Sequence, residues 1–338
     1  MAEKILVIGP AWIGDMVMAQ SLFQLLKQRH PDARIDVVAP AWTEPLLRRM
    51  PEVSEAVFLN VAHGELALVQ RWQLGRRLRE RGYDWAIVLP DTFKSAILAW
   101  VARAPRRTGF RGEYRYGLLN DVRRLDKNKL PRRVDRYIAL AMEAGELAPD
   151  PVPQPRLSAS RKSAEAWLRR HRQSLPQGPV LGICAGAERG PAKRWPASYF
   201  AEVANTQLAA GWKVWLFGSG KDSEVTAEIQ ALTKERCLDL AGLTSLGECI
   251  DLMSMTNAVV TNDSGLMHIA ASLDRDVVAI YGSTHPGYNP PLTAHAKVLY
   301  LGLSCSPCYE GTCPLGHLRC LREIEPAQVL QHLRAQDS

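Results

Sequence analysis

Short apolar runs alternate with longer amphipathic stretches along the first half of the chain. The runs are rich in β-branched residues, and the stretches between them carry apolar residues at helical spacing. This pattern predicts strands over residues 4–8, 34–38, 55–59 and 84–89, and helices over residues 16–28, 65–81 and 94–102. Strands that alternate with helices are typical of parallel βαβ units with helices on both faces of the sheet.

A proline-rich segment, residues 146–156, interrupts this alternation with four prolines in eleven residues. Proline lacks a backbone donor and favours extended chain, so the segment is predicted to be a linker. The alternation then restarts, with strands predicted over residues 180–184, 213–217, 237–240, 258–261 and 277–281, and helices over residues 198–209, 223–232, 246–254 and 266–273. We therefore expect an α/β protein with two doubly wound domains, residues 1–150 and 151–338.

The composition fits a globular protein, with 46% hydrophobic and 23% charged residues among 338. The apolar runs near the N-terminus, residues 5–14 and 16–26, fall short of the roughly 18 residues that a membrane span needs. The first residues have the pattern of a core strand and lack the pattern of a signal peptide. We therefore expect the protein to stay in the cytoplasm.

The net charge of +7 is concentrated in one stretch, residues 103–136. Twelve Lys and Arg residues stand there against four Asp and Glu, a local charge of +8. Such a stretch suits nucleic acid, an anionic membrane surface or a phosphorylated substrate, and it is also compatible with a solvated basic face. No nucleic-acid-binding motif accompanies it, which counts against a nucleic-acid partner.

Three loops of the second half follow predicted strands and lead into predicted helices: residues 184–196, 217–222 and 261–268. Their small residues let backbone N–H groups approach a ligand, Lys193 supplies a cation, and a helix N-terminus favours an anion. Each loop alone is equally explained as a helix cap, and His268 alone is compatible with a core or capping role. Together the three loops predict a site for a nucleotide diphosphate.

In the first half, Asp15 stands in the loop between the first strand and the first helix. That loop lies at the carboxyl edge of the sheet, where open α/β sheets bind ligands. An aspartate near a helix N-terminus is stabilising in any protein. The functional alternative is a general base that faces a cleft between the two domains.

Four segments carry a resemblance to a known family: residues 8–16 (IGPAWIGDM), 107–121, 186–196 and 262–268 (NDSGLMH). They resemble the ADP-heptose:lipopolysaccharide heptosyltransferase II family, and the resemblance covers nearly the whole chain. It implies a GT-B fold, in which two Rossmann-like domains face each other across a cleft. It also implies an acceptor-binding first domain and a donor-binding second domain that binds an ADP-sugar.

The implied reaction is metal-independent transfer, with inversion, of heptose from ADP-L-glycero-beta-D-manno-heptose to heptosyl-Kdo2-lipid A. The enzyme would then associate peripherally with the inner leaflet of the cytoplasmic membrane. Asp15 would be the base, and Lys193 would contact the diphosphate. The other donor-binding residues would be Asp263, Ser264, Gly265 and His268, with Asp222 or Glu224 on the ribose. The acceptor-binding residues would be Trp12, Arg111 and Arg115.

Four of the seven cysteines lie close together near the C-terminus, as Cys305-x2-Cys308-x4-Cys313-x6-Cys320. Disulfides are not expected in a protein without an export signal. The spacing is compatible with a structural zinc ion, for which His317 would be a spare ligand, with free or partly oxidised thiols, and with an iron–sulfur cluster. No cofactor is expected to be required for catalysis.

Other functions remain open from the sequence. A related heptosyltransferase would add the first or third heptose, and a nucleotide-sugar epimerase or a Rossmann oxidoreductase would also present glycine loops to a diphosphate. Gly218-x-Gly220 lacks the third glycine of a dinucleotide fingerprint. No acidic ribose ligand stands about 20 residues after the first strand's loop, which counts against the oxidoreductase. The general base expected at Asp15 argues against a non-catalytic binding module.

Overall fold

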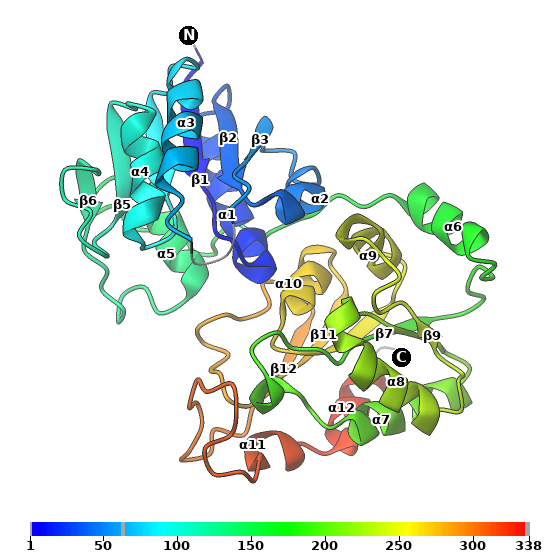
Figure 1. The fold of residues 1–338 in the computed structure, drawn as a ribbon. Helices are drawn as coiled ribbons and strands as arrows, with labels where there is room; N and C mark the ends of the chain where they lie inside the picture. The colour runs from blue at the N-terminus through cyan, green and yellow to red at the C-terminus, as the bar shows by residue number, and fades with distance from the viewer. Residues whose placement is uncertain (1, 62–64, 335–338) are drawn as a thin grey trace. The chain divides into compact units, whose positions relative to one another are not determined.

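A computed structural model describes residues 2–61 and 65–334 (Figure 1). The chain divides into two compact units, the first ending at Arg156 and the second beginning at Leu157. The division falls at the end of the proline-rich segment. We call them unit 1 and unit 2 and describe each by itself.

Unit 1 is a parallel six-stranded sheet with helices on both faces (Figure 1). Its strands are β1 (Lys4–Ile8), β2 (Arg34–Ala39), β3 (Glu55–Phe58), β4 (Trp85–Val88), β5 (Arg106–Phe110) and β6 (Asp121–Arg123). Its helices are α1 (Ile13–Arg29), the short η1 (Ala41–Thr43) and α2 (Glu44–Leu47), α3 (Leu68–Arg79), α4 (Phe93–Val101) and α5 (Arg133–Ala141).

The alternation of side chains along the strands divides the core of unit 1 between the two faces of its sheet. Leu6 and Ile8 of β1 pack in one cluster with Leu74 of α3 and Leu98 of α4. The intervening residue Val7 is also buried, because strands of a parallel sheet are covered on both sides. The short apolar runs of the sequence are therefore the central strands.

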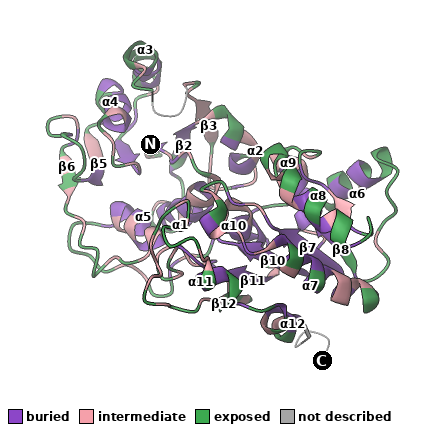
Figure 2. Ribbon diagram, turned by 60° about the horizontal axis from the view of Figure 1, so that its bottom comes forward, coloured by how far each residue is buried: buried purple, intermediate pink, exposed green. Residues whose placement is uncertain are grey.

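Unit 2 is also a parallel six-stranded sheet. Its strands are β7 (Val180–Cys184), β8 (Lys213–Leu216), β9 (Leu238–Asp239), β10 (Ala258–Asn262), β11 (Asp276–Ile280) and β12 (Ala296–Leu299). Its helices are α6 (Arg161–Arg170), η2 (Pro191–Lys193), α7 (Ala197–Ala209), η3 (Gly220–Asp222), α8 (Ser223–Leu232), α9 (Leu246–Met253), α10 (Gly265–Ser272), α11 (Arg319–Arg322) and α12 (Pro326–Arg334). Figure 2 shows β7, β10 and β11 buried at its centre.

The two sheets share one strand order. In unit 1 the order is β3-β2-β1-β4-β5-β6, and in unit 2 it is β12-β11-β10-β7-β8-β9. Counted along its own chain segment, each sheet runs 3-2-1-4-5-6, which is the Rossmann order and confirms the predicted pair of Rossmann-like domains. The order reverses between β1 and β4 and between β7 and β10. Ligands of such sheets bind beyond the carboxyl ends of the strands at that reversal.

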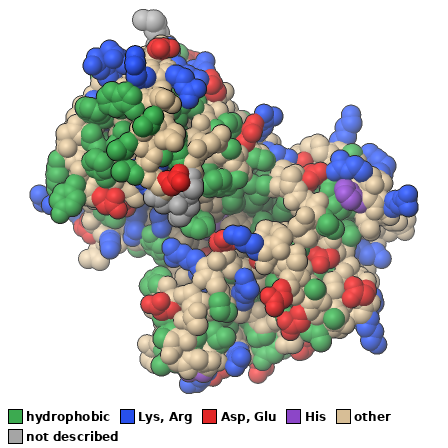
Figure 3. Space-filling view, viewed as in Figure 1, with side chains coloured by type: hydrophobic (Ala, Val, Ile, Leu, Met, Phe, Trp, Pro, Cys, Tyr) green, Lys and Arg blue, Asp and Glu red, His purple; other side chains and the backbone are tan. Residues whose placement is uncertain are grey.

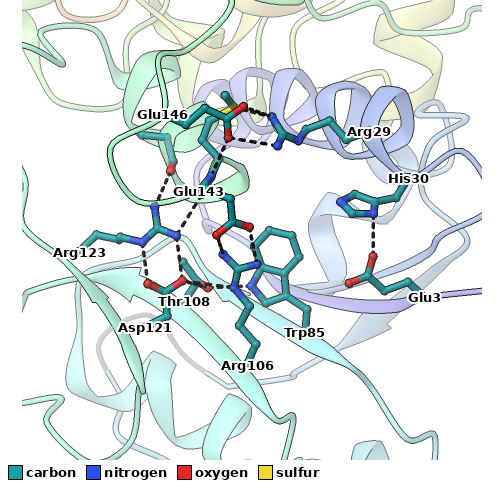
Figure 4. Close-up of polar contacts among 12 residues, drawn as sticks. Glu3, Arg29, His30, Trp85, Arg106, Thr108, Asp121, Arg123, Glu143 and Glu146 are labelled. Atoms are coloured by element: carbon teal, nitrogen blue, oxygen red, sulfur yellow. Dashed lines mark hydrogen bonds and ion pairs between the residues drawn. The ribbon is translucent and has the colours of Figure 1, made fainter.

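The sequence pattern missed two strands in the basic stretch. β5 and β6 carry arginines whose side chains fold back onto acids of unit 1 (Figure 4). Arg106 Nη1 lies 2.9 Å from Glu143 Oε1, and Arg123 Nε lies 2.7 Å from Asp121 Oδ1. Hydrogen bonds from Arg123 hold the pKa of Asp121 at about 2, below its ordinary value. These arginines stabilise the edge of the sheet, so the stretch does not form one uniform basic face.

The remaining positive charge of the stretch is distributed over its loops. The exposed Lys and Arg residues there are Arg103, Arg111, Arg124, Lys127 and Lys129. Within residues 2–61 and 65–334, we find no helix with the length and apolar character needed to cross a bilayer.

Candidate functional site

A lysine and an aspartate meet where the strand order of unit 2 reverses. Lys193 ends η2 in the loop that follows β7, and Asp263 directly follows β10. Lys193 Nζ lies 2.5 Å from Asp263 Oδ2, and the Thr284 hydroxyl donates to the same oxygen at 2.6 Å. The side chains are only 13% and 7% exposed, so the ion pair is largely buried. The structure thus brings together two of the predicted donor-binding residues.

Asn262, the last residue of β10, fixes the loop that carries Lys193. Its side-chain amide donates to the Ala185 carbonyl oxygen at 2.6 Å and accepts from the Trp195 backbone N–H at 3.0 Å. Trp195 is fully buried, and its indole N–H donates to the Ile324 carbonyl oxygen. No role for Asn262 was predicted from the sequence, although this residue begins the Asn-Asp-Ser-Gly motif.

The other predicted donor-binding residues lie at the start of α10. Ser264 caps this helix by accepting from the Met267 backbone N–H, and Gly265 is its first residue. His268 is buried, and burial lowers its pKa to about 4 against the opposing effect of Asp263. At neutral pH the imidazole is therefore uncharged. A ligand anion here would interact with backbone donors and the helix dipole, without a histidine cation.

The two candidates for ribose binding are placed differently. The carboxylate of Asp222 accepts hydrogen bonds from the backbone N–H and the hydroxyl of Ser219, at 2.9 and 2.8 Å. A Cβ added to Gly186 would collide with that carboxylate, so Asp222 fills the space beside the first loop. Glu224 is exposed in the first turn of α8. Asp222 therefore braces two loops, and Glu224 is the more accessible acid.

In unit 1, Asp15 lies in the first turn of α1, beyond the carboxyl end of β1. Its side chain is mostly buried, and its Oδ1 lies 3.5 Å from Arg133 Nε. Arg133 begins α5, which packs against α1. In the sequence Arg133 is only one of the cations of the basic stretch, and the structure places it beside the predicted base. Trp12, directly before α1, is half exposed.

Arg115 is buried at this same edge of unit 1. Its guanidinium is 2% exposed and donates to the carbonyl oxygens of Pro90 and Phe110. Burial lowers its pKa, although the charges of Asp91 and Glu113 oppose that shift. Direct contact of Arg115 with an acceptor was expected from the sequence. In the structure the buried guanidinium joins Pro90 to Phe110, and its contact with an acceptor stays a prediction.

Arg111 remains available at the surface. Its backbone N–H donates to the Arg123 carbonyl oxygen, and its guanidinium carbon lies 5.7 Å from the ring centre of Tyr116. Both side chains are exposed, which fits a cation that can meet a charged ligand.

The four clustered cysteines lie in a segment that packs against the Lys193 loop. The Gly311 carbonyl oxygen accepts from the Ala192 backbone N–H at 3.0 Å, and a Cβ on Gly190 would lie 2.6 Å from that oxygen. Burial, followed by the neighbouring thiols, raises the pKa of Cys320. Backbone hydrogen bonds, foremost from Leu318, lower the pKa of Cys313.

In residues 2–61 and 65–334, no three His, Cys, Asp or Glu side chains are arranged to hold a metal ion. The seven cysteines are free thiols. Zinc at Cys305, Cys308, Cys313 and Cys320 therefore stays a prediction, and any such ion would require these side chains to close around it.

Comparison with known proteins gives one consistent result. The model of glycosyltransferase family 9 (heptosyltransferase) matches residues 71–319. Lipopolysaccharide heptosyltransferase 2 of Salmonella typhimurium is 47% identical over 98% of each chain, and lipooligosaccharide heptosyltransferase 2 of Haemophilus influenzae is 48% identical over 98% of each. The solved structure of the Escherichia coli ADP-heptose lps heptosyltransferase II superposes with a TM-score of 0.87, at 45% identity and with 98% of both chains covered.

Proposed function

This chain belongs to glycosyltransferase family 9, the heptosyltransferases, and from that premise we propose that it transfers heptose from ADP-heptose to heptosyl-Kdo2-lipid A. The observation that carries the proposal is the full-length similarity to heptosyltransferase 2 enzymes. The geometry supports it, since Asp15 and the Lys193–Asp263 pair each lie where the strand order of a sheet reverses. Two such edges suit a reaction that brings a donor and an acceptor together.

Unit 2 would bind the donor. The N-terminus of α10 and the Lys193 ammonium group offer backbone donors and a cation to a diphosphate. Negative charge develops on ADP as it leaves, so donors fixed in advance at that position lower the barrier. Glu224 is our candidate for binding the ribose hydroxyls, because the Asp222 carboxylate already accepts two hydrogen bonds from Ser219.

Asp15 would act as the general base. Its carboxylate takes the proton of the acceptor hydroxyl as the hydroxyl oxygen attacks the anomeric carbon of the heptose. The bond from that carbon to the ADP oxygen breaks as the new glycosidic bond forms, and ADP departs with the bonding electrons. Attack from the side opposite ADP inverts the anomeric carbon. Arg133, 3.5 Å from Asp15, would orient the carboxylate.

Unit 1 would bind the acceptor. Arg111 and Trp12 are exposed and would contact its phosphates and sugar, while Arg115 holds the adjoining loops. The acceptor is a lipid of the inner leaflet, so the enzyme would work in the cytoplasm, peripherally associated with the inner membrane. No nucleic-acid partner and no catalytic metal ion enter this proposal.

The alternatives from the sequence are less well supported. The family match indicates glycosyl transfer and does not favour an epimerase or an oxidoreductase. Addition of the first or third heptose is disfavoured because the most similar relatives named above are heptosyltransferase 2 enzymes.

A donor assay tests the proposal. The purified chain is incubated, with a chelator present, with a heptosylated inner-core acceptor and either ADP-heptose or a UDP-hexose. The masses of the products are then determined by mass spectrometry. We expect one added heptose and free ADP from ADP-heptose alone. Transfer from the UDP-hexose alone, or no transfer from ADP-heptose, would refute it.

A further inference from the structure

Two tryptophans are exposed side by side on the outer surface of unit 1. Trp72 of α3 and Trp100 of α4 have ring centroids 6.0 Å apart and are 49% and 43% exposed. Val69, one turn before Trp72, is 65% exposed. We call the whole set the α3–α4 apolar surface, and its residues are Leu66, Leu68, Val69, Trp72, Phe93 and Trp100. A folded protein seldom exposes so many large apolar side chains together without a partner.

The helix period explains why these apolar side chains are exposed. Leu74 and Leu78 of α3 are buried against the sheet, so residues on the opposite side of the helix face solvent. A Cβ on Gly75 would lie 2.6 Å from the Val101 Cβ, and α3 and α4 therefore pack closely. The two tryptophans are thus presented on a fixed pair of helices.

Arginines border the apolar side chains. Arg76, Arg77 and Arg79 are exposed on the last turns of α3, and Arg103 is exposed just after α4. Glu80 is the exposed acid among them, so the end of the surface beside Trp72 and Trp100 carries a net positive charge. The exposed acids Glu65 and Glu113 lie at the other end, beside Leu66 and Phe93. In Figure 3, hydrophobic side chains gather over α3 and α4, with Lys and Arg side chains at the upper edge and Asp and Glu side chains at the lower edge.

We propose that the α3–α4 apolar surface, with its border of arginines, docks this chain on the anionic surface of a lipid bilayer. Tryptophan places its apolar ring at the level of the headgroups, and arginine meets the lipid phosphates while its stem stays on apolar surface. Each cation near an anionic leaflet adds to the electrostatic attraction toward that surface. The positive charge beside Trp72 and Trp100 favours an anionic bilayer at this end of the surface over an uncharged protein partner or a second copy of the chain.

The inference rests on the proposed function in one respect, namely that the acceptor is carried by a lipid. No helix among the described residues has the length and apolar character to enter the bilayer as a span, so contact with that acceptor would be peripheral. The docking surface would then retain the enzyme beside its acceptor between turnovers.

Sedimentation of the full chain with vesicles tests the proposal. Vesicles of phosphatidylcholine alone are compared with vesicles that also contain phosphatidylglycerol. We expect binding to the anionic vesicles, with an affinity that falls as salt rises. Trp72→Ser should weaken that binding on the order of 10-fold through lost apolar burial, and the pair Arg76→Gln and Arg77→Gln should weaken it by a similar factor through lost charge.

The matched control is Leu243→Ser, an equally polar change at an exposed apolar residue of unit 2, which should bind as wild type. The arginine variant alters only exposed side chains, so it keeps the test valid if Trp72→Ser lowers the melting temperature. Vesicle binding unchanged in both variants would overturn the proposal. A concentration-dependent dimer that is abolished by Trp72→Ser would also overturn the proposal, because the surface would then join two copies of the chain.

Activity separates this inference from the proposed function. With a water-soluble, deacylated acceptor, all variants should transfer heptose at the wild-type rate. With the lipid-borne acceptor in anionic vesicles, the Trp72 and arginine variants should be slower and the Leu243 variant should not. If the wild-type chain binds vesicles but transfers no heptose to the soluble acceptor, the proposed function is refuted and the proposed docking surface is still supported.

Discussion

Lys193 Nζ lies 2.5 Å from Asp263 Oδ2, although 70 residues separate the two in the chain. The strand order of unit 2 explains the contact. Lys193 follows β7 and Asp263 follows β10, and these neighbouring strands flank the reversal of the sheet. Lys193 neutralises the buried Asp263 carboxylate, and in the proposed function it would also contact the diphosphate of the donor.

Replacing Lys193 should therefore affect both stability and binding. Lys193→Ala leaves the Asp263 carboxylate buried without its cation, and the free energy of unfolding should fall by about 3 kcal/mol. It also removes a charge-assisted bond to the donor, so ADP should bind roughly 10–100-fold more weakly. Adenosine, which has no phosphate, should bind to the folded variant as before. Urea unfolding and calorimetric titration measure these effects.

The control for this change is Lys221→Ala. Lys221 pairs with Glu188 at 2.6 Å, but both side chains are largely exposed. Exposed pairs contribute little, so this variant should keep its stability to within about 0.5 kcal/mol. A Lys193 variant as stable as the Lys221 variant, with unaltered ADP affinity, would contradict both roles.

Asp15 should be required for turnover and not for folding. Asp15→Asn keeps the size of the side chain but cannot accept the acceptor proton, so turnover should fall roughly 10²–10⁴-fold. The affinity for ADP should not change, because the proposed donor residues lie in unit 2. Asp32→Asn, an exposed acid of unit 1 just after α1, is the matched control and should retain full turnover. An active Asp15→Asn enzyme would remove the assignment of the base.

The sequence predicted the site best where local pattern determines structure. Strand ends place Asp15, Lys193 and Asp263 at the carboxyl edges of their sheets, and periodicity locates those ends. The sequence could not predict the Arg133–Asp15 contact, because that contact depends on the packing of α5 on α1. Nor could it predict that Arg115 is buried, since a run of arginines gives no sign of which guanidinium groups meet carbonyl oxygens.

The Lys193–Asp263 contact also determines whether replacing Lys193 lowers the stability of the unliganded protein. A lysine near a helix N-terminus opposes the helix dipole, which alone predicts that its removal is harmless to the unliganded protein. A buried partner 70 residues away reverses that sign, and only the strand order reveals it.

His268 should make stability fall in mild acid. Burial holds its folded pKa at about 4, whereas an unfolded histidine titrates near 6.5. Between these values the unfolded chain binds a proton that the folded chain does not, so stability rises with pH through this window and is lost as pH falls through it. The loss attributable to His268 approaches about 3 kcal/mol near pH 4.

Urea unfolding of wild type and His268→Gln at pH 7 and pH 4.5 measures this loss. Glutamine has no titrating group, so the variant should lose less stability than wild type over that interval. Equal losses in the two proteins would show that His268 is not buried in its neutral form.

The four clustered cysteines can be tested by metal analysis. The zinc hypothesis predicts one zinc ion per purified chain, lost on replacing Cys305 and Cys308 with Ser, and kept in the control Cys249→Ser, whose thiol is buried in α9. The Gly311 carbonyl oxygen accepts a hydrogen bond from the Ala192 backbone N–H, beside Lys193. Loss of zinc from the cysteine segment should therefore disturb the Lys193 loop and weaken ADP binding a few-fold. A chain without metal, in which all four thiols react freely with a thiol reagent, would contradict the hypothesis.

A turnover assay with three acceptors measures directly whether the chain adds the second heptose. ADP-heptose is offered with Kdo2-lipid A that carries no heptose, one heptose or two, and the rate of ADP release is measured for each. We expect rapid release with the one-heptose acceptor and at least about 100-fold slower release with the other two, since a site shaped for that terminal sugar leaves polar groups unpaired when the sugar is absent. Preference for the acceptor with no heptose or with two, or equal rates for all three, would contradict the proposed addition of the second heptose.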